Sequence, residues 1–128
     1  MNMDYELDII ENDEYVTAKL TGVRRPSSLL EAAAETTAYC KEKGIHHLFI
    51  DIRGMSGELD TIETYEVAGQ GIPSQPNTRR LIRSAILDLT ENIERIRFFE
   101  TVATNRGLIV KFFDDKEAAV RWLLADQQ

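Results

Sequence analysis

The stretch NRGLIVKFFDDKEAAVRWL, from Asn105 to Leu123, has the pattern of a helix end, a strand and a second helix. The Asn-Arg-Gly at 105–107 is typical of a helix C-terminus, where glycine adopts the left-handed conformation and a cation meets the helix dipole. The apolar LIVKFF then predicts a strand, and Asp114 with Glu117 forms a capping pair for the next helix. The residues of that helix expected to face inward are Ala118, Ala119, Trp122 and Leu123. A helix, a strand and a helix in this order indicate an α/β fold.

The same helix start and stop signals recur earlier in the sequence. Residues 24–44 predict a helix with Ser28 and Glu31 as a capping box and Gly44 as its stop, followed by the buried strand HHLFIDI at 46–52. A short helix from about Asp60 to Ala68, capped by Asp60 and Glu63, ends in the breaker-rich GQGIPSQPN. The strand RLIRSAILDL and the helix at 90–107, in which Glu91 supports Arg95, lead to the stretch quoted first.

The N-terminus predicts two further strands. YELDII, from Tyr5 to Ile10, and YVTAKLTG, from Tyr15 to Gly22, alternate in polarity and form a hairpin. The expected order is therefore ββαβαβαβα in a single domain spanning residues 1–128. Its sheet is mixed and mostly parallel, with the antiparallel hairpin strand at one edge.

Composition narrows the function classes. A chain of 128 residues with 43% hydrophobic residues fits one globular core, and a net charge of −7 argues against binding to nucleic acid or to an anionic membrane surface. Cys40 is the only cysteine, so no internal disulfide forms, and its place on the inward stripe of a helix predicts a buried, inert thiol. With no signal peptide and no long apolar segment, we expect a soluble cytoplasmic protein without integral membrane association.

Known catalytic, metal and cofactor signatures do not occur. His46 and His47 are adjacent in a strand and point to opposite faces, so they cannot chelate one metal together. The GQG at 69–71 follows a helix rather than a strand and indicates a helix stop, not a dinucleotide fingerprint. The cluster of Arg79, Arg80 and Arg83 favours a solvated strand entrance over an anion site. We therefore expect no cofactor, no metal and no catalytic residue.

The loop DIRGMSGELDT at 51–61 is the predicted binding site because ligands gather at the carboxyl ends of parallel strands. Its candidate ligand- or partner-binding residues are Arg53, Ser56, Asp60 and Thr61, and Thr61 and Ser56 are also candidate phosphoacceptors. A purely structural interpretation stands beside this one. In it, the glycines serve the turn, Arg53 pairs with a nearby acid and Thr61 occupies the first turn of a helix.

Two segments carry a resemblance to a known group. LFIDIRGMSG and FFETVATNRGLIVKFFDDKEAAVRWL resemble the central strand, and the closing strand and helix, of the SpoIIAA-like family of STAS-type domains. This is the anti-sigma-factor-antagonist fold, which is sometimes grouped with Sec14-like lipid binders. In the antagonists a hydroxyl after Asp is phosphorylated by a partner kinase; the stretch here is Asp60-Thr61-Ile62-Glu63, without the second hydroxyl and the glycine. For the SpoIIAA-like branch the resemblance implies a non-polar ligand between helices and sheet and no catalytic residues.

We therefore expect a non-enzymatic STAS-like binding or regulatory module whose partner is a protein or a small apolar or anionic ligand. Two alternatives stay open. One is a small hydrolase-like enzyme whose acid and base residues are carboxylates with His46 or His47. The other is a purely structural homodimer that uses exposed apolar residues such as Tyr15 or Phe113.

Overall fold

The computed structural model describes residues 5–70 and 82–127, and its elements follow the predicted order ββαβαβαβα. The strands are β1 (Tyr5–Glu11), β2 (Val16–Val23), β3 (His47–Ser56), β4 (Arg83–Leu87) and β5 (Ile109–Phe113). The helices are α1 (Pro26–Lys43), α2 (Thr61–Gln70), α3 (Ile93–Asn105) and α4 (Lys116–Leu123), with short 3-10 turns at Thr90–Asn92 and Ala125–Gln127. Residues 71–77 of the breaker-rich stretch, together with Arg79 and Arg80, lie outside the described residues.

The strands form one sheet in the order β1-β2-β3-β4-β5. β1 and β2 are antiparallel, whereas each later neighbouring pair is parallel. The mixed sheet, its mostly parallel character and the hairpin strand at one edge are thus confirmed. Parallel neighbours require crossovers, and α1, α2 and α3 supply them.

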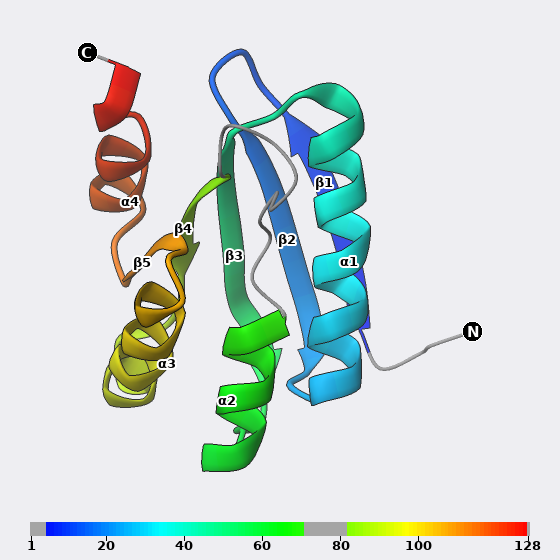
Figure 1. Ribbon diagram of the computed structural model, residues 1–128, viewed down its shortest axis with the longest axis vertical. Coiled ribbons are helices and arrows are strands. Elements are labelled where there is room, and N and C mark those ends of the chain that lie inside the picture. The colour runs from blue at the N-terminus through cyan, green and yellow to red at the C-terminus, as the bar shows by residue number, and fades with distance from the viewer. Residues whose placement is uncertain (1–4, 71–81, 128) are drawn as a thin grey trace.

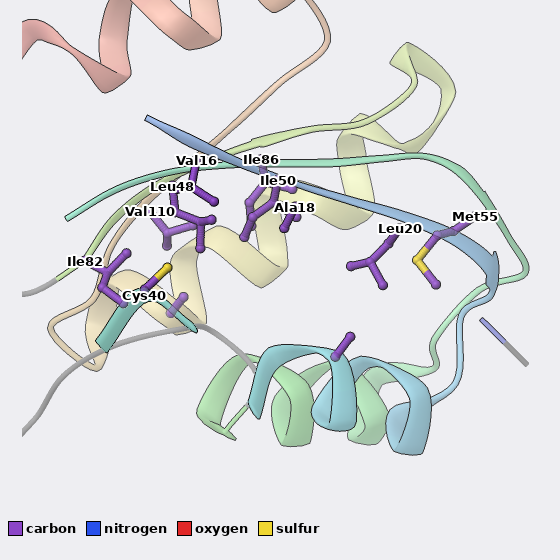
Figure 2. Packing of buried hydrophobic residues seen from close by; sticks show 12 residues of the cluster. Val16, Ala18, Leu20, Cys40, Leu48, Ile50, Met55, Ile82, Ile86 and Val110 are labelled. Carbon is purple, nitrogen blue, oxygen red and sulfur yellow. The ribbon is translucent and has the colours of Figure 1, made fainter. Parts of the chain in front are cut away.

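Two apolar clusters place the sheet between helical layers. On one face, Val16, Ala18 and Leu20 of β2 pack with residues of α1 and α3, and Figure 1 shows α1 and α2 in front of the sheet. On the other face, Ala119 and Leu123 of α4 pack against Phe49, Ala85 and Leu87. Figure 2 shows α4 on the opposite side of the sheet from α1 and α2.

Two helix stops agree with the sequence, whereas two starts and the end of α2 differ: the stop predicted at Gly69 is wrong, because α2 continues through Gly69 to Gln70. Gly44 and Gly107 end α1 and α3 with φ of 69° and 85°. The predicted capping box at Ser28 is wrong, because α1 begins two residues earlier at Pro26, whose fixed φ suits the first helical position, and Ser28 is buried. The third cap is also displaced by one residue. Asp115, not Asp114, accepts a hydrogen bond from the backbone N–H of Ala118 at 2.9 Å.

The central strand is longer than predicted and carries a bulge. β3 continues through Arg53 to Ser56, residues that the sequence pattern had placed in a loop. Lys19 pairs with Asp51 and Thr21 with Gly54, so β3 holds one extra residue opposite β2. A β-carbon at Gly54 would lie 2.8 Å from Cγ2 of Thr21, which explains the glycine.

Several side chains differ from their predicted environment. Tyr15 and Phe113, expected to be exposed, are half-buried. The Tyr15 ring meets Phe49 edge-on, and the Phe113 ring is tilted against Trp122. Burial of Cys40 is confirmed, and it raises the pKa of the thiol to about 11. Arg83 lies 3.9 Å from the ring centroid of Trp122 and donates to its carbonyl oxygen.

Candidate functional site

Arg24 joins the carboxyl ends of three parallel strands. From the end of β2, it donates to the carbonyl oxygens of Met55 and Gly57 at 3.2 and 3.1 Å. It also donates to both carboxylate oxygens of Asp88, which follows β4, at 2.9 Å. The two side chains are only 12% and 3% exposed. Either charge alone would be costly in this buried position, so the two side chains stay paired. The pair therefore holds the strand ends in a fixed geometry.

Beside this ion pair lies an apolar pocket of about 130 Å³ between the sheet and the three helices on its first face. Its lining is mostly aliphatic and aromatic: Ala18, Leu20, Leu29, Ala32, Ala33, Ile50, Ile52, Leu59, Val67, Ile86, Phe99 and Phe112. Figure 2 shows Ala18, Leu20, Ile50 and Ile86 pointing from the sheet toward α1 and α2. Such a concave, apolar space with few polar groups is typical of a small-molecule site.

The exposed lining residues mark the mouth of the pocket. These are Gly57, Glu58 and Arg95, of which the first two belong to the β3–α2 connection and the third to α3. Arg95 Nη1 and Glu58 Oε1 lie 2.7 Å apart, and this ion pair joins the two sides of the mouth. The predicted pairing of Arg95 with Glu91 is wrong: Arg95 turns toward the pocket, where it forms the ion pair with Glu58 and donates a hydrogen bond to Asn92.

Arg53, the first predicted site residue, is engaged by its own strand. Its Nη2 and Nε donate to the Asp51 carboxylate at 2.9 and 3.1 Å. Burial works against ionisation of Asp51, but the hydrogen bonds from Arg53 outweigh it and lower the pKa of the carboxyl. Side chains alternate along β3, so Asp51 lies on the same face of the sheet as Phe49, the face that α4 covers, whereas Ile50 and Ile52 face the pocket. Arg53 is therefore not part of the pocket lining.

The other predicted site residues follow the bulge. Ser56 ends β3, and its hydroxyl is 3.4 Å from the carbonyl oxygen of Gly22. Asp60 caps α2 as predicted, since its carboxylate accepts from the N–H of Glu63 at 2.8 Å while Glu63 accepts from the N–H of Asp60 at 3.0 Å. Thr61 is exposed in the first turn of α2, and the adjacent Ile62 is 79% exposed.

The structure does not gather these residues into one cluster. Among the described residues, no hydrogen bond or ion pair joins any two of Arg53, Ser56, Asp60 and Thr61. Gly57, Glu58 and Leu59 of the predicted loop line the pocket, whereas Arg24, Asp88 and Arg95, which also line it, were not predicted as site residues. The available signal was an Arg directly after one strand and an Asp directly after another, a pair that parallel strands bring to one edge.

Other reactive groups lie elsewhere. His47 Nε2 and Asp126 Oδ1 are 2.7 Å apart, and this hydrogen bond lowers the pKa of Asp126. Within residues 5–70 and 82–127, no group of three or more His, Cys, Asp or Glu side chains is arranged to hold a metal ion. None of the helices in this part of the chain is both long and apolar enough to cross a membrane.

No protein-family model matches the chain, and no curated protein matches it in sequence. Solved structures resemble it, including the following two. An anti-sigma factor antagonist from Mycobacterium paratuberculosis has a TM-score of 0.60 at 11% identity, with 93% of each chain covered. A protein of the DUF3478 family with a SpoIIAA-like fold, from Shewanella loihica PV-4, has a TM-score of 0.50 at 17% identity, covering 96% of this chain and 97% of that one. The chain therefore has the SpoIIAA-like, STAS-type fold that its sequence resembles.

Proposed function

We propose that this protein is a non-enzymatic, cytoplasmic binding module that holds a small apolar molecule between its helices and its sheet. The apolar pocket of about 130 Å³ carries this proposal. Folding normally fills such space with side chains, and interiors are close-packed, so a lined pocket that reaches solvent is suited to an occupant. The titratable groups that line it, Arg24 with Asp88 and Arg95 with Glu58, are engaged in ion pairs. They therefore support binding rather than acid–base catalysis.

Ala33 offers a direct test because it lines the pocket, while the adjacent Ala34 is exposed on the same helix. Nuclear magnetic resonance titration with hexan-1-ol, a neutral apolar probe, is expected to shift the signals of pocket residues in the native protein. Ala33→Leu is expected to abolish these shifts, because the larger side chain occupies the pocket, whereas Ala34→Leu is expected to preserve them.

The stability of Ala33→Leu supplies the control. Since its side chain enters open space, we expect the melting temperature to stay within a few degrees of the native value, unlike ordinary overpacking of a filled core, which costs about 1–3 kcal/mol. Saturable binding of hexan-1-ol that survives Ala33→Leu would exclude the pocket as the site.

A second candidate function is docking of a partner protein on the first turn of α2. Ile62 supports it, because its side chain is 79% exposed next to Thr61 and offers a partner an apolar contact. One protein of similar structure is an anti-sigma factor antagonist, and this name says that its target is another protein. Thr61 and Ser56 remain the proposed phosphoacceptors by which such docking would be regulated.

A further inference from the structure

We propose that the pocket recognises a short-chain monocarboxylate, whose carboxylate replaces Glu58 on Arg95 and whose tail of about six carbons fills the apolar space. This inference rests on the proposed binding function and specifies the ligand of the same site. Three observations carry it: the placement of Arg95, the unequal anchoring of the two charges at the mouth, and the size of the pocket.

Arg95 is held in position by a chain of hydrogen bonds that begins in the interior. Asp88, buried against Arg24, accepts from Nδ2 of Asn92 at 3.0 Å. Asn92 in turn accepts from Nη2 of Arg95 at 2.8 Å. The guanidinium is therefore oriented at the mouth by the same ion pair that fixes the strand ends. Preorganised donors of this type lose little side-chain entropy when they bind a carboxylate.

Glu58 is the less anchored partner. Its side chain is 71% exposed, compared with 44% for Arg95, and among the described residues the 2.7 Å pair with Arg95 is the only ion pair or hydrogen bond of this side chain. Exposed ion pairs contribute at most about 1 kcal/mol, so a competing anion can replace Glu58 at small cost. A cationic ligand that took the place of Arg95 as the partner of Glu58 would also break the hydrogen bond between Arg95 and Asn92. The mouth therefore favours an anion.

The other charges at the pocket do not compete for the ligand. Arg24 already donates to the backbone of β3 and to Asp88, and Asp88 also accepts from the backbone N–H of Leu89 at 2.7 Å. This pair is neutral as a whole and nearly enclosed. An incoming carboxylate thus meets one exposed guanidinium, Arg95, with which it can form two parallel hydrogen bonds.

The size of the pocket limits the tail. A cavity of about 150 Å³ is known to hold benzene, so the 130 Å³ here accommodates roughly six carbons. Its walls, including Leu20, Ile50 and Phe99, are apolar and suit a saturated chain. Two-chain lipids and sterols are too large to be enclosed. The structure thus points to a single short chain with one charged end.

The test compares hexanoate with hexan-1-ol in titrations of the whole chain at pH 7, where the carboxylate is ionised. We expect hexanoate to bind about fivefold more tightly than hexan-1-ol, the upper range for an exposed ion pair. Arg95→Gln is expected to remove this preference without changing the affinity for hexan-1-ol. Arg97→Gln, which alters an exposed arginine of α3 that does not line the pocket, is the matched control and is expected to keep it. Glu58→Gln, which removes the competing carboxylate, is expected to tighten hexanoate binding about twofold.

The outcomes separate the two proposals. If hexan-1-ol binds in the pocket but hexanoate binds no more tightly, or if the preference survives Arg95→Gln, the carboxylate inference is wrong and the binding function stands. If neither compound binds, both are wrong. Dodecanoate tests the size limit: binding more than tenfold tighter than that of hexanoate would overturn the six-carbon tail.

Discussion

Arg24 illustrates how much of this fold depends on one side chain that no sequence motif marks. From the end of β2, its guanidinium donates to the carbonyl oxygens of Met55 in β3 and of Gly57 just after it, and to the carboxylate of Asp88 after β4. Asp88 is 3% exposed, so removal of the arginine would leave a carboxylate that is largely withdrawn from water. Loss of one partner from a buried pair leaves an uncompensated charge and costs more than the pair itself contributes.

We therefore expect Arg24→Met to lower the free energy of unfolding by about 3 kcal/mol, measured by urea denaturation. Arg53→Met is the control, since the Arg53 side chain is 49% exposed, and its pair with Asp51 should be worth less than about 1 kcal/mol. The double variant Arg24→Met/Asp88→Leu should recover much of the loss because no buried charge remains. Equal costs for Arg24→Met and Arg53→Met would contradict this account.

The contrast between Arg53 and Arg24 shows what a strand-end argument can find. Proximity to the central strand singled out Arg53, whose partner, Asp51, is only two residues away. Arg24 and Asp88 are separated by 64 residues, and their meeting depends on the register of three strands. That register is set by packing along the whole sheet, which a local pattern does not contain.

Helices and strands were predictable in kind and less so at their ends. Hydrophobic periodicity reflects burial of a whole face, so every strand and helix was placed in the right order. The residue at which a helix begins depends on single hydrogen bonds, and for α4 either Asp114 or Asp115 could supply the cap. The Asp114 carboxylate instead accepts from the hydroxyl of Thr90 at 3.0 Å. The bulge in β3 was likewise not predictable, because it depends on pairing with β2.

The cap of α4 gives a prediction for this element. Asp115→Ala removes the acceptor of the Ala118 N–H and is expected to cost about 1 kcal/mol, or about 4 °C in melting temperature, because α4 covers the second face of the sheet. Asp114→Ala, which removes only an exposed hydrogen bond, should cost less than half as much. The reverse order in thermal denaturation would show that Asp114 is the true cap.

For the molecule as a whole, the fold class followed from the sequence and the resemblance implied a non-polar ligand between helices and sheet, whereas the set of residues that lines the pocket did not follow. Its lining comes from all three helices of one layer and from four strands, including Ala18, Ile50, Ile86 and Phe112. Whether side chains fill or leave a space between layers depends on their volumes in three dimensions, and periodicity reports only which face is buried.

Docking on α2 is tested on the intact protein. Affinity capture from the cells of origin is expected to recover a partner with the native chain, and to lose it with Thr61→Glu or Ile62→Glu, because each places a charge on the exposed first turn. Thr101→Glu, an exposed threonine on α3, is the control and should retain it. Unchanged capture by Thr61→Glu and Ile62→Glu, with melting temperatures near the native value, would exclude this surface.

The order of the strands has a consequence for how the chain reaches its fold. In the sheet β1-β2-β3-β4-β5, each strand pairs only with the strands immediately before and after it in the sequence. No strand must therefore wait for a later one to be inserted beside it, and the loops closed at each step stay short. During synthesis, the sheet can grow in one direction from the N-terminal hairpin, each crossover helix adding one strand to the free edge as it leaves the ribosome.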